Sequence, residues 1–90
     1  MNATLRLVTH AEQWTGQLHP RVWHRWWSKR PFIMIDLSGG GCASRDLAHG
    51  DWILSHPHPA LPSYVRYWVV SDHEFKRFYR LEPDGSCTRP

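Results

Sequence analysis

The chain has 90 residues, a length from which we expect one domain with a thin hydrophobic core. Six Trp, three Tyr and three Phe are a large aromatic share for this length, so we expect part of it to form a contact patch at the surface. The formal net charge of +3, with Arg supplying nine of the eleven basic residues, permits nucleic acid or an acidic protein as partner and requires neither.

The first predicted elements are a strand and an amphipathic helix. Alternating side chains over Thr4–Thr9 predict the strand. Pro20 suits the first turn of a helix and Pro31 ends one, so His19–Ser28 is predicted to be helical. On a helical wheel, one face of roughly 140° gathers four apolar side chains, Val22, Trp23, Trp26 and Trp27. This helix is the clearest amphipathic pattern in the sequence.

Three strands separated by two loops are predicted next. The apolar run Phe32–Leu37 predicts a buried strand, and Asp51–Ser55 a second one. Between them Ser38–Gly50, with three consecutive glycines, predicts an irregular mobile loop. His56–Pro62 is rich in proline and predicts an extended loop. Ser63–Val70, with Tyr, Val and Trp throughout, predicts the strongest strand.

A second helix has a complete start signal. Ser71 and Glu74 form a capping box, and Val70 with Phe75 forms the hydrophobic staple around it. The apolar stripe continues to Tyr79, and the helix is expected to end near Arg80.

These elements predict the fold class and the domain organisation. Their order is β-α-β-β-β-α, and hairpin connections make the neighbouring strands antiparallel. We therefore predict a small single α+β domain over residues 1–90, with a mainly antiparallel sheet of three to four strands and two helices. Residues 84–90 are predicted to be a frayed tail.

Neither a metal site nor a catalytic site is predicted. His56 and His58 flank Pro57, but no second ligand pair stands at a matching spacing. Cys42 follows three glycines without a catalytic signature around it, and the glycines lack the Lys of a phosphate-binding loop. We therefore expect a chain that is not an enzyme and that holds no cofactor and no metal.

Two interpretations of the Trp-rich helix stay open. Its tryptophans either pack on the sheet, as apolar stripes usually do, or lie partly exposed beside basic residues. Exposed Trp and Arg are typical of interaction hot spots and of surfaces that stack bases and neutralise phosphates. The candidate binding residues on this segment are Arg21, Trp23, Arg25, Trp27, Lys29 and Arg30.

A second basic and aromatic group comes later in the chain. It comprises Arg66, Tyr67, Lys76, Arg77 and Arg80, of which Arg66 and Arg77 join the candidate site. The sequence alone does not say whether the two groups share a face of the molecule.

The expected compartment is the cytoplasm. Apolar runs are no longer than four residues, which excludes a membrane-spanning helix. The segment Met1–Val8 contains Arg6 and has no apolar stretch of signal-peptide length. Cys42 and Cys87 are far apart in the sequence, so we expect reduced thiols rather than a disulfide or a metal site.

Motifs in about half of the chain resemble a family of small phage and prophage proteins of unassigned role. Those proteins open with a strand and a "vQWTG" motif, which Glu12–Gly16 matches. They continue with a "pGDWIv" strand and a short helix reading "vsdeeFrrtYep". The matching segments here are His49–Leu54, Val70–Tyr79 and Leu81–Pro83. Val22–Trp27 and the glycine and His-Pro loops have no counterpart. The shared motifs are therefore expected to fix the fold, and any specific function to lie in the middle of the chain.

The resemblance implies a phage-type accessory protein that acts by blocking a host machine. Our leading hypothesis is a non-enzymatic binding protein, cytoplasmic in a bacterial host, that inhibits or redirects a host protein or nucleoprotein complex. Such a protein would occlude its target sterically through Trp and Arg anchors, and the target could be a defence complex of the CRISPR kind. The alternative is a small nucleic-acid-binding protein that uses the basic and aromatic surface.

Overall fold

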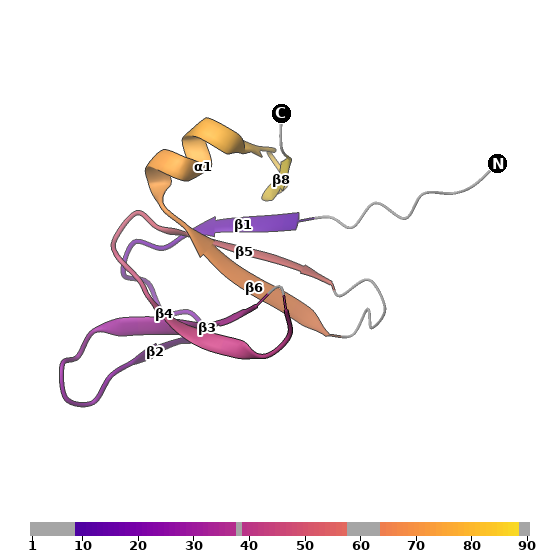
Figure 1. The fold of residues 1–90 in the computed structure, drawn as a ribbon. Helices are drawn as coiled ribbons and strands as arrows, with labels where there is room; N and C mark the ends of the chain where they lie inside the picture. The colour runs from indigo at the N-terminus through magenta and orange to yellow at the C-terminus, as the bar shows by residue number, and fades with distance from the viewer. Residues whose placement is uncertain (1–8, 38, 58–63, 89–90) are drawn as a thin grey trace.

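The computed structural model describes residues 9–37, 39–57 and 64–88, and within them it contains eight strands and one helix (Figure 1). In chain order these elements are β1 (Thr9–Gln13), β2 (Val22–His24), β3 (Pro31–Asp36), β4 (Cys42–Asp46), β5 (Trp52–Pro57), β6 (Val65–Val70), α1 (Asp72–Phe78), β7 (Arg80–Leu81) and β8 (Ser86–Thr88).

The strands form two antiparallel sheets. The larger sheet has the order β6-β5-β1-β8-β7, and the smaller one has the order β2-β3-β4. Helix α1 lies on one side of the larger sheet and the smaller sheet on the other (Figure 1). The chain is therefore a small α+β domain with mostly antiparallel strands, as expected, although its main sheet has five strands rather than three or four. No helix in these described segments is long and apolar enough to cross a membrane.

A hydrophobic core lies against each face of the larger sheet, and β5 shows this most clearly. Its side chains alternate, as in any strand: Trp52 and Leu54 belong to the core beneath α1 with Phe75. Ile53 points the other way and packs in a second core with Ile33 of the smaller sheet. A strand buried on both faces needs apolar residues in succession, which accounts for the unbroken apolar run that predicted this strand.

Helix α1 begins as the sequence predicts. The Ser71 hydroxyl oxygen accepts a hydrogen bond of 3.2 Å from the backbone N–H of Glu74, so Ser71 caps the first turn. Phe75 is buried. It stacks on Trp52 at a centroid distance of 3.9 Å and on Tyr79 at 5.4 Å. The helix ends at Phe78, two residues before the expected end near Arg80.

The predicted helix over His19–Ser28 is wrong. Val22–His24 forms β2, which pairs with β3 so that Trp23 lies opposite Phe32. The backbone N–H of Arg25 donates to Arg30, and Lys29 adopts a φ of 59° in the turn. A helix of about ten residues is marginal on its own. Val and Trp favour strands when a partner strand is available, and β3 is that partner.

Two further segments are more ordered than the sequence predicts. Within the expected loop Ser38–Gly50, residues 42–46 form β4 and pair with residues 32–36 of β3. Within the expected tail 84–90, residues 86–88 form β8 between β1 and β7, and Cys87 is buried in the core. Both strands are short and depend on partner strands: β4 pairs with β3, which precedes it in the chain, and β8 pairs with the distant β1 as well as with β7. Of the first expected strand only Thr9 is described, and most of the His-Pro loop also lies outside the described residues.

Candidate functional site

The β2–β3 hairpin, residues 22–36, exposes three tryptophans, and we call it the Trp hairpin. Trp23 is 62%, Trp26 79% and Trp27 65% exposed. The rings of Trp26 and Trp27 meet edge to face with centroids 5.7 Å apart, so the turn presents one continuous aromatic surface. A contiguous patch of exposed apolar side chains is typical of an interaction site.

The side chain of Arg25 connects this hairpin to β4. Its guanidinium forms an ion pair of 2.9 Å with Asp46 and donates to the Ser44 hydroxyl at 3.2 Å. The same group lies over the Phe32 ring at 4.6 Å and near the Trp27 ring at 5.8 Å. Arg25 was predicted as a binding residue. Its charge is already neutralised by Asp46, so its clearest role is to hold Trp27 in position.

A pocket of about 270 Å³ adjoins the hairpin at the side of Trp23. The side chains of Met34 and Val65 add apolar wall, and Arg21 lines the pocket with its guanidinium 5.1 Å from the centre of the Tyr67 ring. Arg21 has no acidic partner among the residues that the structure describes. The pocket therefore combines exposed apolar surface with a cation available for a ligand.

Asp36 joins the smaller sheet to β6 beside this pocket. Its carboxylate accepts a hydrogen bond of 2.8 Å from the Tyr64 hydroxyl and one of 3.0 Å from the backbone N–H of Tyr67. The hydrogen bond and the negative charge of Asp36 raise the pKa of Tyr64, because ionised Tyr64 would lose the bond and face a second negative charge.

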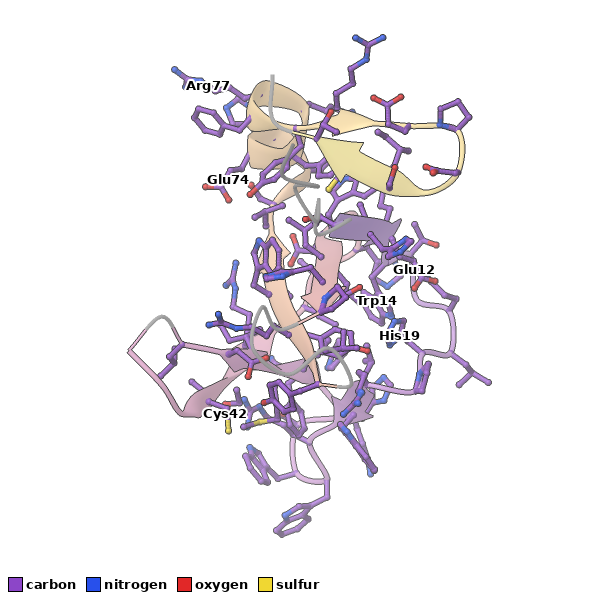
Figure 2. All side chains as sticks on the ribbon, turned by 90° about the vertical axis from the view of Figure 1, so that its right-hand side faces the viewer. Glu12, Trp14, His19, Cys42, Glu74 and Arg77 are labelled. Carbon is purple, nitrogen blue, oxygen red and sulfur yellow. The ribbon has the colours of Figure 1, made fainter. Side chains whose placement is uncertain are left out.

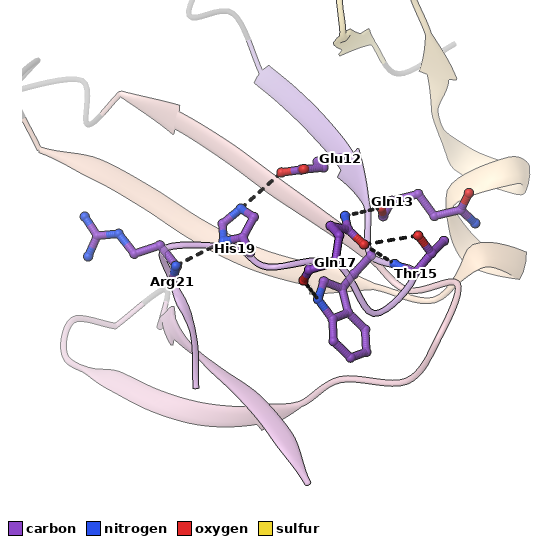
Figure 3. Close-up of polar contacts among 7 residues, drawn as sticks. Glu12, Gln13, Thr15, Gln17, His19 and Arg21 are labelled. Atoms are coloured by element: carbon purple, nitrogen blue, oxygen red, sulfur yellow. Dashed lines mark hydrogen bonds and ion pairs between the residues drawn. The ribbon is translucent and has the colours of Figure 1, made fainter. Parts of the chain in front are cut away.

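The backbone of Arg21 is positioned by the segment that follows β1, whose residues form hydrogen bonds with one another (Figure 3). His19 Nε2 contacts Glu12 at 3.1 Å, and His19 Nδ1 accepts a hydrogen bond of 3.0 Å from the backbone N–H of Arg21. Gln17 donates to the backbone of Gln13 at 2.9 Å and accepts from the Thr15 hydroxyl at 3.1 Å. These contacts direct the chain from the larger sheet to the mouth of the pocket.

The motifs behind the family resemblance occupy structural positions. Trp14 is buried, and its indole N–H donates to Gln17 at 3.1 Å. Gly16 has a φ of +94°, and a Cβ there would lie 2.9 Å from the His49 ring, so this position requires glycine.

The second motif meets the first at the start of α1. Asp72 accepts hydrogen bonds from the Trp52 indole at 2.9 Å and from Gln13 at 3.3 Å. The bond from Trp52 is the main cause that lowers the pKa of Asp72, followed by the bond from Lys76. Both motifs thus contribute to one junction of β1, β5 and α1, which supports the expectation that they serve folding.

The structure divides the predicted binding residues between two ends of the molecule. Arg21, Trp23, Arg25, Trp27, Lys29 and Arg30 come together on or beside the Trp hairpin, although on strands and a turn rather than on a helix. Arg66 belongs with them because it lines a second pocket with Tyr64 and Asp36. Arg77 does not, because it lies on α1 at the opposite end from Cys42 (Figure 2), where its guanidinium contacts the Phe78 ring at 5.3 Å.

Sequence reasoning missed three residues of this surface. Trp26, the most exposed tryptophan, was not among the candidates, and neither were Met34 and Tyr64. A hairpin interpretation of the segment would have placed Trp26 in the turn. Nothing in the sequence distinguishes exposed Met34 from buried Ile33 beside it, because only the packing of the smaller sheet on the larger one decides which face of β3 is covered.

The described residues include no group of three His, Cys, Asp or Glu side chains that could hold a metal ion. Cys42 is exposed, Cys87 is buried, and both are free thiols. Burial raises the pKa of Cys87. His58, one of the histidines considered above, lies outside the described residues.

Charge is distributed unevenly over the described residues. The smaller sheet, its turns and the start of β6 carry six Arg and Lys residues against two Asp, a formal net charge of +4. The other described residues carry three Arg and Lys against six Asp and Glu, a net charge of −3. The exposed tryptophans therefore lie at the basic end of the molecule.

Comparisons with protein-family models, with curated proteins and with solved structures find no match to this chain.

Proposed function

We propose that this chain is a non-enzymatic binding protein that docks its Trp hairpin onto an acidic surface of a larger protein complex. The exposure of Trp23, Trp26 and Trp27 carries the proposal. Tryptophan is among the residue types most enriched in interaction hot spots, where truncation to Ala costs about 2 kcal/mol or more of binding free energy. The ion pair of Arg25 with Asp46 favours binding further, because a turn that is ordered before contact loses less entropy on association.

An acidic partner is supported by the cations around these rings. Lys29 and Arg30 in the turn have no acidic partner among the described residues. Complementary charge accelerates encounter and selects partners more than it adds affinity. Apolar anchors with a basic surround therefore fit a protein surface that offers apolar pockets rimmed by Asp and Glu.

Inhibition by steric occlusion is the form of this function that the family resemblance supports. A domain this small can cover part of a host protein or nucleoprotein complex in the bacterial cytoplasm and block access to it. A defence complex of the CRISPR kind is the target class we propose to test first.

Affinity capture with matched variants tests the proposal. The wild-type protein, a Trp26→Ala/Trp27→Ala variant and a Phe78→Ala/Leu81→Ala control are immobilised and exposed to host lysate. The control removes two other exposed apolar side chains, which lie on or just after α1 at the opposite end. We expect the wild type and the control to retain the same complex, which is then purified. The hairpin variant should bind it at least about 100-fold more weakly. Equal retention by all three proteins would refute the proposal.

Nucleic-acid binding is the second candidate, favoured by Arg21 and Arg66 beside the exposed rings of Trp23 and Tyr64. Such a surface can stack bases and neutralise phosphates. Fluorescence anisotropy with single-stranded DNA and RNA of about 12 nucleotides tests it. Affinity that falls steeply between 50 and 200 mM salt, roughly as expected for several phosphate contacts, would support this candidate, and absence of binding at low salt would remove it.

A further inference from the structure

The hydrogen-bonding pattern of the smaller sheet leaves one edge of β3 open at the pocket. On the β4 side, Leu47 donates to Pro31 and Leu37 donates to Gly41, so odd-numbered residues of β3 exchange bonds with β4. Bonded pairs alternate along an antiparallel ladder. Even-numbered residues, Met34 among them, therefore direct their backbone N–H and C=O groups to the β2 side.

The hydrogen-bonded pairing between β2 and β3 ends before it reaches Met34. Its bonded pairs are Arg25 with Arg30 and Trp23 with Phe32, and the next would be Arg21 with Met34. The backbone N–H of Arg21 donates to His19 instead, and the pairing ends at Val22 and Ile33. Met34 consequently has no strand partner on this side among the described residues.

Met34 lines the pocket of about 270 Å³, which lies between the start of β2 and the start of β6. The pocket thus offers an unpaired strand edge, apolar walls from Trp23 and Val65, and the guanidinium of Arg21. An open edge of this kind is where an extended peptide adds as a further strand, with backbone bonds supplying affinity and side-chain pockets supplying specificity.

We propose that this pocket binds an extended acidic peptide segment, whose backbone pairs with Met34 and whose carboxylate meets Arg21. The proposal rests on the proposed function, because the segment would belong to the same partner that the Trp hairpin contacts. The surrounding charge of +4 favours carboxylates over cationic peptides.

A peptide fits this pocket better than a single-stranded nucleic acid does. A nucleic-acid backbone has no alternating N–H and C=O groups to pair with Met34. Met34 and Val65 add aliphatic wall beside the rings of Trp23, Tyr64 and Tyr67, and the aliphatic side chains of a peptide can pack on both kinds of surface.

Chemical-shift titration of the ¹⁵N-labelled protein tests the proposal with three blocked octapeptides. The first alternates Glu and Val, the second replaces Glu by Lys, and the third is the first peptide N-methylated throughout, which removes its N–H donors. We expect saturable shifts of the Met34 amide and of the Trp23 indole signal with the first peptide. The other two should bind at least about tenfold more weakly.

Two variants assign that binding to the pocket. Arg21→Glu should weaken binding of the first peptide by at least about tenfold, and Arg77→Glu at the other end should change it less than about twofold. If Arg21→Glu does not fold, as its spectrum would show, Arg21→Gln takes its place with a smaller loss in the same direction. The proposal is overturned if the first peptide causes no saturable shift at millimolar concentration. It is equally overturned if the N-methylated peptide binds as tightly as the first peptide. The same holds if the shifts come from self-association of the protein, or if an oligonucleotide causes them and the peptide does not.

The Trp26→Ala/Trp27→Ala variant separates this proposal from the proposed function. It should bind the first peptide as the wild type does and yet lose the captured complex. A protein that captures its complex without binding the peptide would refute the pocket alone. A protein that binds the peptide, but captures no complex whose retention requires Trp26 and Trp27, would refute the proposed function alone.

Discussion

Phe75 and Phe78 lie three residues apart on α1 and have different environments. Phe75 is 3% exposed between Trp52 and Tyr79, whereas Phe78 is 48% exposed. Phe75→Ala should lower the free energy of unfolding by about 3–5 kcal/mol, because it removes a buried ring and leaves a cavity. Phe78→Ala is the matched control and should change it by less than about 0.5 kcal/mol. Urea unfolding followed by Trp fluorescence measures the free energy of unfolding of both variants. Similar losses of stability in the two would contradict the placement of Phe75 in the core beneath α1.

Tyr64 provides a pH-dependent test of the contact between β3 and β6. The hydrogen bond to Asp36 raises the pKa of Tyr64 above its ordinary value of 10.0, so the neutral phenol is favoured in the folded state. The stability that this contact contributes is therefore complete below pH 10 and is lost as the pH rises through the raised pKa. In Asp36→Asn we expect Tyr64 to titrate at lower pH, as measured by tyrosinate absorbance, with Tyr64→Phe identifying its contribution. An unchanged titration in Asp36→Asn would contradict the contact.

Among the elements, α1 is the one whose start the sequence predicts most accurately. The cap is local, because Ser71 and Glu74 are three residues apart and need no distant partner. Ser71→Ala should lower the free energy of unfolding by about 1 kcal/mol, because the backbone N–H of Glu74 loses its acceptor. Ser71→Asp restores an acceptor and should stay within about 0.5 kcal/mol of the wild type. Thermal or urea unfolding checks both variants, and equal losses would exclude a capping role.

The β2–β3 hairpin is the element for which the sequence pattern misleads. Val22, Trp23, Trp26 and Trp27 lie on one side of a helical wheel, yet two of them belong to a strand and two to a turn. Short apolar runs are ambiguous between the two periods. The strand Pro31–Asp36 supplies the partner that resolves the ambiguity, and no feature within residues 19–28 reveals that pairing.

On the scale of the whole molecule, the basic end and the acidic remainder should act independently. The longest extent of the molecule is 55 Å, whereas charges in about 0.1 M salt are screened beyond roughly 10 Å. Lys29→Glu/Arg30→Glu and Lys76→Glu/Arg77→Glu change the net charge equally. We expect the first variant to elute from a cation-exchange column at clearly lower salt than the second, because the exposed basic end makes the contact. Identical elution would show that net charge alone governs retention.

The sequence by itself determined the α+β class, the strands at Phe32–Leu37, Asp51–Ser55 and Ser63–Val70, and the capped start of α1. These features follow from side chains adjacent in the chain, whose periodicity, β-branching and hydrogen-bonding groups act locally. The sequence also identified Trp and Arg around residues 21–30 as the candidate contact surface, since their composition is independent of the element that carries them.

Only the tertiary structure decided how those residues are presented. Pairing with β3 turned the expected helix into a hairpin and exposed Trp26. The packing of β6 beside β3 brought Arg66 to the second pocket, with Tyr64 and Asp36, and left Arg77 at the far end. The open edge at Met34 exists because Arg21 bonds to His19 instead of continuing the ladder. The position of Arg66 depends on a contact between segments far apart in the chain, and the hairpin and the open edge depend on which strand pairs with which. The side-chain pattern of a single segment does not encode strand pairing.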